Sequence, residues 1–217
     1  MPLDNEKIRE TIKELRDKSE KRSFNQSVEL IINLRDIDMK APEGRIQEVI
    51  ELPYQTKKNL SICVLATGDT ALRARKAGAD IVLQREEIES LANDKKKQRE
   101  LAKKADFFIA EAPLMPLVGR VFGSILGPRG KMPTPVPPTA NMEDVIGRHR
   151  RIIGIRVRSQ PIIQCRIGTE DMTDEELIDN IQTVIRRLEG RLKRGIKNIG
   201  SIYLKTTMGS SVKIDIS

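Results

Sequence analysis

Aromatic side chains are scarce: the chain of 217 residues has no tryptophan, two tyrosines and four phenylalanines. Proteins that bind single-stranded nucleic acid without sequence preference stack successive bases on exposed aromatic rings. A chain with so few rings gives little support to that function. It stays an alternative, and it predicts aromatic platforms that the sequence barely supplies.

Cysteine and histidine are equally scarce. Cys63 and Cys165 lie far apart in sequence, with no second cysteine or histidine near either. This spacing excludes a zinc cluster and predicts two reduced, buried thiols in a cytoplasmic protein. His149 is the only histidine, which disfavours histidine-based triads and multi-histidine metal sites. We expect no metal and no cofactor.

Long hydrophobic runs are also missing. No apolar stretch approaches the ~18 residues of a transmembrane helix, and the first residues, Met1 to Lys7, lack the apolar core of a signal peptide. We therefore expect no membrane partner. The net charge of +8 instead points to a polyanionic partner, with nucleic acid favoured over a membrane surface.

The two ends of the chain read as an α+β pattern. Asp4 can cap a helix with apolar residues at helical spacing, and residues 28–34 alternate with period two, as a half-buried strand requires. Residues 45–52 predict a second strand. In the last third we expect a hairpin of 154–158 with 162–167, a helix opened by a capping box at Thr173, and closing strands at 201–207 and 212–216.

The middle of the chain has a different character. Short apolar runs predict strands buried on both faces, and helix-prone segments separate them, which is typical of a doubly wound α/β unit with a parallel sheet. We expect strands at 61–67, 81–83 and 107–110, and helices at 70–77, 86–91, 95–104, 114–126 and 141–149. The predicted fold class is thus α/β and α+β in two domains.

One domain is expected to be a split α+β two-layer sandwich made of residues 1–55 and 153–217. The other, residues 56–152, is expected to be an inserted Rossmann-like three-layer α/β domain. The two chain crossings between them could act as a hinge.

Signatures of an enzyme are weak. The turn at Thr67 to Asp69 holds one glycine where a dinucleotide fingerprint needs three, and the segment 127–131 lacks two residues that a P-loop requires. No nucleophile stands with a recognisable base. We predict that the chain is not an enzyme. An enzyme with a nucleotide ligand on the α/β insert stays the alternative, and tight mononucleotide binding would favour it.

The stretch from Leu126 to Pro138 contains five prolines and two glycines, so we expect it to continue neither a helix nor a sheet ladder. Its first eight residues, Leu-Gly-Pro-Arg-Gly-Lys-Met-Pro, resemble the signature of the L1 family of large-subunit ribosomal proteins. Residues 24–29, Phe-Asn-Gln-Ser-Val-Glu, and 206–214, Thr-Thr-Met-Gly-Ser-Ser-Val-Lys-Ile, resemble the same family, in wording closest to its archaeal branch.

The resemblance implies a structural constituent of the large ribosomal subunit that binds large-subunit ribosomal RNA and forms the mobile lateral stalk. It also implies help in releasing tRNA from the exit site, and a repressor role through binding of the protein's own operon messenger RNA. The expected setting is the cytoplasmic ribosome, with a monomer outside it.

The resemblance also implies the contact residues. The expected RNA-binding set on the split domain is Phe24, Gln26, Ser27, Glu29, Ser201, Thr206, Thr207, Met208, Gly209 and Ser211. Secondary RNA or tRNA contacts are expected at Arg129, Lys131 and Arg158. Relatives carry lysine where this chain has Ser159-Gln160, so a phosphate contact in that loop is not carried over.

Physical reasons accompany part of this set. Glu29 lies on the strand face away from the apolar residues, where a carboxylate can accept hydrogen bonds from 2′-hydroxyls and base amines. Phe24 fits either a core position or a stacking platform. Gly209 should supply a positive φ or leave room for RNA. Thr207 should lie beside Ser27, if the first and last strands are neighbours.

Charge points elsewhere. Residues 56–152 carry 18 basic and 11 acidic residues, whereas the remainder is nearly balanced. Electrostatics alone would place the polyanion on the insert, where a basic run spans 95–104. A second basic run, 186–197, follows the long helix of the last third. Runs of this kind are usually solvated faces, and specificity needs rigidly held hydrogen-bonding groups rather than phosphate contacts. We therefore place the main contact on the split domain.

Overall fold

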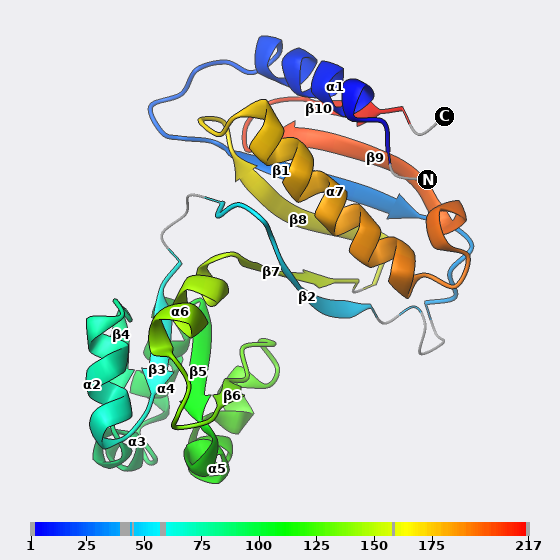
Figure 1. The fold of residues 1–217 in the computed structure, drawn as a ribbon. Coiled ribbons are helices and arrows are strands. Elements are labelled where there is room, and N and C mark those ends of the chain that lie inside the picture. The colour runs from blue at the N-terminus through cyan, green and yellow to red at the C-terminus, as the bar shows by residue number, and fades with distance from the viewer. Residues whose placement is uncertain (1–2, 40–43, 45, 57–59, 158, 216–217) are drawn as a thin grey trace. The chain divides into compact units, whose positions relative to one another are not determined.

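The computed structural model describes residues 3–39, 44, 46–56, 60–157 and 159–215. The chain forms two compact units (Figure 1): unit 1 comprises Met1–Lys58 with Arg151–Ser217, and unit 2 comprises Asn59–Arg150. The mixed α/β class with several sheets, one of them parallel, is confirmed. The domain boundaries expected after residues 55 and 152 stay a prediction.

Unit 1 begins with helix α1, Asn5–Asp17, and strand β1, Ser27–Leu34. The Asp4 carboxylate caps α1 by accepting a hydrogen bond from the Glu6 N–H at 3.0 Å, as the sequence predicts. Half-buried and buried residues alternate along the whole of β1. The period-two pattern is therefore a reliable guide here, because only one face of β1 meets the core.

β1 is an inner strand of a four-stranded antiparallel sheet with the order β10-β9-β1-β8. The other strands are β8, Ile162–Thr169, β9, Ile199–Thr206, and β10, Ser211–Ile214. Two helices, α1 and α7 (Asp174–Arg191), bury their apolar stripes in one core with the even-numbered residues of β1. The short helix η3, Gly195–Asn198, links α7 to β9. Both long helices thus cover the same face of the sheet (Figure 1).

Strands β2, Gln47–Glu51, and β7, Ile152–Arg156, form a separate antiparallel pair. The predicted hairpin of residues 154–158 with 162–167 is therefore wrong. β8 instead pairs with β1 through seven register positions, from Ser27 to Asn33. Nearness in sequence favours the hairpin, but pairing β7 with β2 lets Ile50 and Ile155 enter the core that α7 covers.

Unit 2 is built on a parallel sheet with the order β4-β3-β5-β6. Its strands are β3, Ile62–Leu65, β4, Ile81–Leu83, β5, Phe107–Glu111, and β6, Thr134–Val136. Its helices are α2, Gly68–Lys76, α3, Arg85–Ser90, α4, Lys95–Lys104, η2, Ala112–Leu114, α5, Met115–Leu126, and α6, Met142–Arg150.

Alternate residues of β3 enter two different cores. Cys63 and Leu65 pack with residues of α3, α4 and α5, whereas Ile62 and Val64 pack with residues of α2 and α6. The sheet is therefore the middle layer of three, and this explains why its strands are continuous apolar runs.

The expectation that residues 126–138 join no sheet is wrong for β6. This strand pairs in parallel with β5, and Pro135 stands opposite Ala110. β6 is the edge strand of the sheet. Proline is tolerated at an edge because its missing N–H can fall on the side without a neighbour.

Asn180 is a buried polar residue on the core side of α7, with an exposed fraction of 0%. Its side-chain oxygen accepts a hydrogen bond from the Tyr54 N–H at 3.1 Å, and its amide donates to the carbonyls of Tyr54 at 3.2 Å and Ile167 at 2.8 Å. One side chain therefore ties the segment after β2 and the strand β8 to α7.

We predict that Asn180→Ala lowers the free energy of unfolding by about 2–4 kcal/mol, because the change leaves buried backbone groups without partners. Urea unfolding of the two proteins measures this. The neighbouring, exposed Asp179→Ala serves as the control and should stay within about 0.5 kcal/mol of wild type. Equal stability of both variants would contradict the assigned role.

Both thiols are free and buried, as expected. Burial raises the pKa of Cys63 from 9.0 to about 12. Burial, with a smaller contribution from the Glu29 charge, raises the pKa of Cys165 to about 12. Each thiol therefore stays neutral in the folded protein at a pH where the unfolded chain ionises it.

This difference predicts how stability depends on pH. The folded pKa lies above the unfolded one, so the stability it contributes is full below pH 9 and is lost as pH rises from about 9 to 12. Between pH 8 and 10 the Cys63 thiol should cost wild type about 1.4 kcal/mol that Cys63→Ala does not lose. Urea unfolding of both proteins at the two pH values measures the difference, and parallel losses would contradict it.

Candidate nucleic-acid interface

The start of β1 and the end of β9 form one continuous surface. Val28 stands opposite Thr206 in the ladder, and beyond it the Thr207 N–H donates to the Ser27 carbonyl at 3.1 Å. The Ser27 N–H in turn donates to the Thr207 hydroxyl oxygen at 3.0 Å. β1 and β9, the last strand but one, are thus neighbours, and Thr207 lies beside Ser27 as predicted.

Gln26 is buried beneath this surface and anchors it through hydrogen bonds. It is 1% exposed, and its amide nitrogen donates to the Ser19 hydroxyl, the Glu20 carbonyl and the Glu170 carboxylate at 3.0–3.3 Å. Its amide oxygen accepts from the Met208 N–H at 3.0 Å. The polar atoms of the Gln26 side chain thus bind protein groups and position the 207–210 turn, and direct RNA contact by Gln26 stays a prediction.

Thr206 also has protein partners. Its side chain is 2% exposed, and its hydroxyl oxygen lies 3.2 Å from the Ser19 hydroxyl and accepts from the Gly209 N–H at 3.1 Å. The hydroxyl thus shapes the turn, and its contact with RNA stays a prediction.

Gly209 is required for a reason internal to the protein. It is not among the glycines with positive φ, so of its two expected roles only that of leaving room for RNA stays a prediction. A Cβ at this position would overlap the Thr206 hydroxyl oxygen. The space predicted for RNA is thus used at least in part by the turn itself.

The remaining predicted residues of unit 1 reach solvent. Ser27, Glu29 and Ser201 are half-buried on the sheet face away from the helices, and Thr207 and Ser211 are exposed. Phe24 is 49% exposed and Met208 is 62% exposed. Phe24 is therefore not a core residue. A cavity of about 200 Å³ beside the turn is lined by Lys18, Glu20, Arg22, Gln26, Met208, Gly209 and Ser210.

Register adds residues that the sequence reasoning missed. Glu29 stands opposite Lys205 on β9 and Arg166 on β8. The Arg166 guanidinium donates to the Ser27 hydroxyl at 3.3 Å, and the Lys205 ammonium donates to the Thr207 carbonyl at 2.9 Å. The alternation of β8 and β9 could have placed both cations on this face once the strand order was known.

The secondary contacts have a different setting. The Lys131 ammonium donates to the carbonyls of Ala102 at 3.1 Å and Ala105 at 2.7 Å, so it caps the C-terminus of α4. Arg129 is exposed and lies at 3.5 Å from the Arg99 carbonyl. The prediction for Arg158 lies outside the described residues.

The place where an α/β sheet usually binds a nucleotide is occupied by protein. This place is the switch point of the strand order, here between the carboxyl ends of β3 and β5. The Glu111 carboxylate, 6% exposed, accepts from the Thr67 N–H at 3.0 Å and the Thr67 hydroxyl at 2.9 Å. An internal anion therefore stands where a phosphate would bind.

Neither a metal site nor a membrane-spanning helix is found among the described residues. Among those residues, no group of three or more His, Cys, Asp or Glu side chains is placed to hold a metal ion. No described helix is long and apolar enough to cross a membrane.

Comparison with known proteins gives a consistent result. The model of the "Ribosomal protein L1p/L10e family" matches residues 15–210. The "Large ribosomal subunit protein uL1" of Pyrococcus abyssi is 45% identical over 215 residues, covering 99% of this chain and 98% of its own length. The protein of that name in Thermofilum pendens is 47% identical over 209 residues, covering 95% and 92%. That of Hyperthermus butylicus is 45% identical over 211 residues, covering 97% of each.

The turn geometry generates a stability prediction. Gly209→Ala should lower the free energy of unfolding by about 1–3 kcal/mol, because the new methyl group overlaps the Thr206 hydroxyl. The same change in a Thr206→Ala background should cost much less, since the obstructing oxygen is gone. A double-mutant cycle measured by urea unfolding tests this coupling. Strictly additive effects would show that the glycine is needed for another reason.

Proposed function

The chain belongs to the ribosomal protein L1p/L10e family, and from this membership we propose that it binds large-subunit ribosomal RNA through unit 1. The resemblance expected from three short segments is confirmed. The family is one of non-enzymatic structural proteins, and the relatives named above are large-subunit proteins. We therefore interpret the surface of unit 1 as the contact of a structural ribosomal protein with RNA.

The observation that supports this surface best is the rigid connection between the 207–210 turn and the start of β1. The turn is held by the Ser27–Thr207 bonds and by the buried Gln26. Specific recognition requires polar groups fixed at close range, because flexible groups lose conformational entropy on binding. Thr207 fulfils this condition, and Met208 adds an exposed apolar side chain beside it on the same turn.

The face beside the turn offers both kinds of hydrogen-bonding partner. Glu29 can accept from 2′-hydroxyls and base amines, whereas the neighbouring Arg166 and Lys205 can donate to phosphates. The exposed Phe24 and Met208 add apolar surface on which a base or ribose can pack. This mixture fits a folded RNA, which is recognised through shape and a few exposed bases.

Unit 2 would contribute affinity rather than specificity. Helix α4 exposes a set of cationic side chains, namely Lys95, Lys96, Lys97, Arg99, Lys103 and Lys104. Asp94 at the start of α4 forms an ion pair with Lys97. Lysines on an exposed helix act as point charges, so we expect them to add salt-dependent attraction to RNA or to exit-site tRNA.

The finer roles are part of the same proposal. Binding to ribosomal RNA would build the mobile lateral stalk that helps to release tRNA from the exit site. The same surface would bind the protein's own messenger RNA where that RNA presents the same groups, and this would repress translation. We propose that the protein is a monomer outside the ribosome and acts in the cytoplasm.

The central test pairs Thr207→Ala with Lys96→Ala. Thr207→Ala should weaken binding to a large-subunit RNA transcript by about 1–3 kcal/mol, because RNA groups would be desolvated without a partner. It should leave the salt dependence unchanged, since no charge is lost. Lys96→Ala should cause a small loss that disappears at high salt. Binding titrations at two salt concentrations measure both effects.

Stability provides the control for this pair. Thr207→Ala also removes the acceptor of the Ser27 N–H, which is solvent-accessible, so unfolding should become easier by about 1 kcal/mol. Circular dichroism at the binding temperature must show both variants folded. If Thr207→Ala binds like wild type and Lys96→Ala is the more damaging change, the recognition surface lies on unit 2 and the proposal fails.

A further inference from the structure

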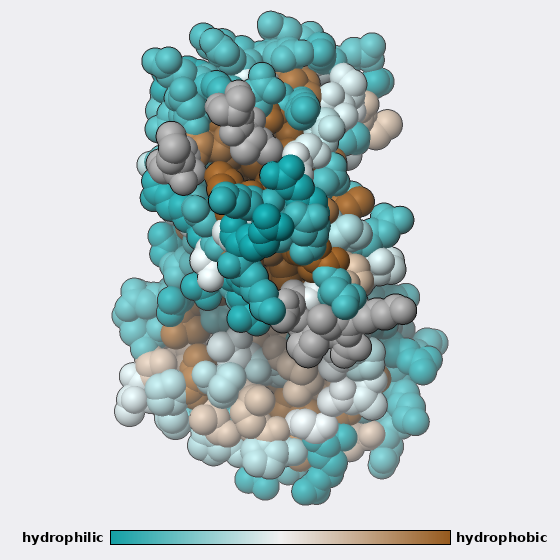
Figure 2. Space-filling model, turned by 90° about the vertical axis from the view of Figure 1, so that its right-hand side faces the viewer, coloured by the Kyte–Doolittle hydropathy of each residue, from teal (hydrophilic) through white to brown (hydrophobic). Residues whose placement is uncertain are grey.

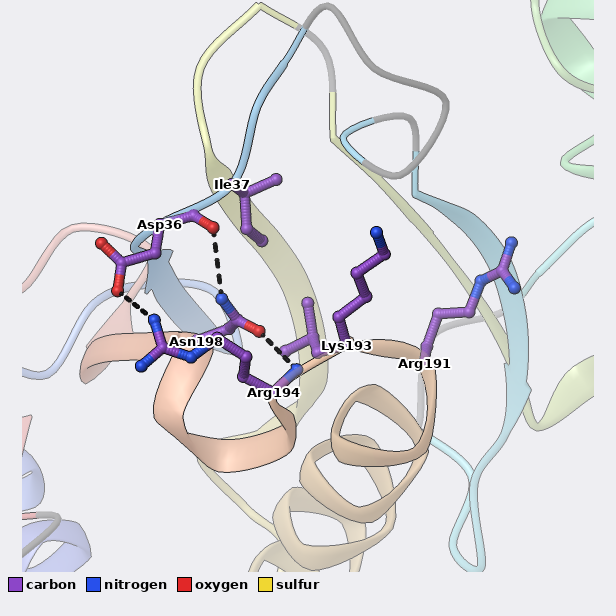
Figure 3. Close-up of a pocket in the computed structure, with 7 residues that line it drawn as sticks. Asp36, Ile37, Arg191, Lys193, Arg194 and Asn198 are labelled. Carbon is purple, nitrogen blue, oxygen red and sulfur yellow. Dashed lines mark hydrogen bonds and ion pairs between the residues drawn. The ribbon is translucent and has the colours of Figure 1, made fainter.

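A cavity of about 400 Å³ lies where β1 and α7 both end. At ~30 Å³ per water molecule this is room for roughly a dozen waters. The residues that line it come from the segment after β1 and from the segment that follows α7: Asp36, Ile37, Arg191, Leu192, Lys193, Arg194 and Asn198. Figure 3 shows the Lys193 side chain extending into the space between Ile37 and Arg191.

One wall of the cavity is held rigidly. Asn198 is 3% exposed, and its amide nitrogen donates to the carbonyls of Arg35 at 3.0 Å and Asp36 at 3.4 Å. Its amide oxygen accepts from the Arg194 N–H at 2.9 Å. These bonds tie the end of β1 to the segment after α7 (Figure 3).

The backbone at Asp36 is strained. Among the described residues, Asp36 is the non-glycine residue with a positive φ, at 56°, and this conformation costs free energy that its neighbours must offset. Its carboxylate accepts from the Arg194 guanidinium at 2.9 Å. The strained residue is therefore also the one whose carboxylate orients Arg194 at the rim of the cavity.

The lining is cationic. It contains Arg191, Lys193 and Arg194 against the single carboxylate of Asp36. Arginine presents a planar fork of donors that matches a phosphate group. Arg191 forms an ion pair with Glu48 at 3.2 Å, but its own side chain stays 61% exposed, so it can also contact a ligand.

The helix dipole does not explain this arrangement. A cation in the last turn of a helix is favourable near the carbonyl end, and this accounts for Arg191. Lys193 and Arg194 lie beyond Leu192, the residue at which α7 is capped. They line a cavity rather than extend along the helix, and this position fits a bound anion.

We propose that this cavity binds a phosphate group, and that the phosphate belongs to the sugar–phosphate backbone of RNA. The guanidinium groups and Lys193 would contact the phosphate oxygens, and the apolar Ile37 and Leu192 would pack against the ribose. The phosphate chemistry follows from the cavity alone. RNA as its source rests on the proposed function.

This contact is separate from the surface around Thr207. That surface lies at the Ser27 end of β1, whereas the cavity lies beyond Leu34 at the other end. An eight-residue strand at ~3.3 Å per residue spans roughly 26 Å, which is more than one phosphate-to-phosphate step of an RNA strand. Figure 2 shows that the side of the molecule at the right of Figure 1 is mostly hydrophilic, with smaller apolar areas among the polar residues.

The test measures the salt dependence of binding to a large-subunit RNA transcript. Arg191→Gln combined with Arg194→Gln should weaken binding about tenfold at low salt. It should also reduce the slope of log K against log salt by about 0.9 for the one phosphate lost. Lys13→Gln is the control, because Lys13 is exposed on α1 of the same unit, and it should leave the slope unchanged.

If the double variant does not fold, a second variant that is expected to strengthen RNA binding still tests the proposal. Glu48 forms ion pairs with Arg187 at 2.9 Å and Arg191 at 3.2 Å. Glu48→Gln should release both guanidinium groups and strengthen RNA binding severalfold at low salt. A purely structural ion pair would instead lower stability and leave RNA binding unchanged, which would overturn the proposal.

Inorganic phosphate separates the two sources of the anion. If the arginine variants keep the wild-type RNA slope, but millimolar phosphate raises the melting temperature of wild type only, the cavity binds free phosphate and RNA as the source is overturned. If neither RNA slope nor phosphate response changes, the whole inference fails. If Thr207→Ala binds RNA like wild type while the arginine variants lose slope, the proposed recognition surface fails and this site stands.

Discussion

Unit 1 depends on the position of β1 between two strands from the other end of the chain. β8 pairs along one side of β1 and β9 along the other. This pairing gathers residues from both chain ends into one sheet and lets α1 and α7 share one core. It also fixes the two ends of β1, beside which lie the surface proposed for RNA recognition and the cationic cavity.

Two buried side-chain amides, those of Gln26 and Asn198, fix the chain segments next to these strands. Gln26 anchors the turn after β9, and Asn198 anchors the segment after α7. Each side chain is almost fully buried and has partners for both its oxygen and its nitrogen. A buried polar group without partners is costly, whereas a satisfied one selects a single arrangement of its neighbours. The exposed residues around them are therefore held at fixed positions.

Periodicity predicts much of this fold, because the pattern of apolar residues along a strand indicates which of its side chains are buried. The alternation of residues 28–34 and the apolar run at 61–67 identify β1 and β3 with their burial. Strand partners are not local, and this is why the hairpin ending at residue 167 is wrong and β6 is missed. The sequence pattern does not predict the structural roles of Gln26 and Thr206 for the same reason. Their burial depends on partners from distant segments, such as Glu170 and Ser19.

The split of unit 1 has a consequence for synthesis on the ribosome. Unit 2 lies wholly between the two parts of unit 1, so it emerges complete while β1 still lacks β8 and β9. At a synthesis rate of roughly 5–20 residues per second, the apolar side of β1 therefore has no strand partner for several seconds. Ser27 can bond to Thr207 only after residue 207 has been synthesised, well after unit 2. A nascent chain that stops before residue 207 cannot form this turn, and so it lacks the surface that we propose for RNA recognition.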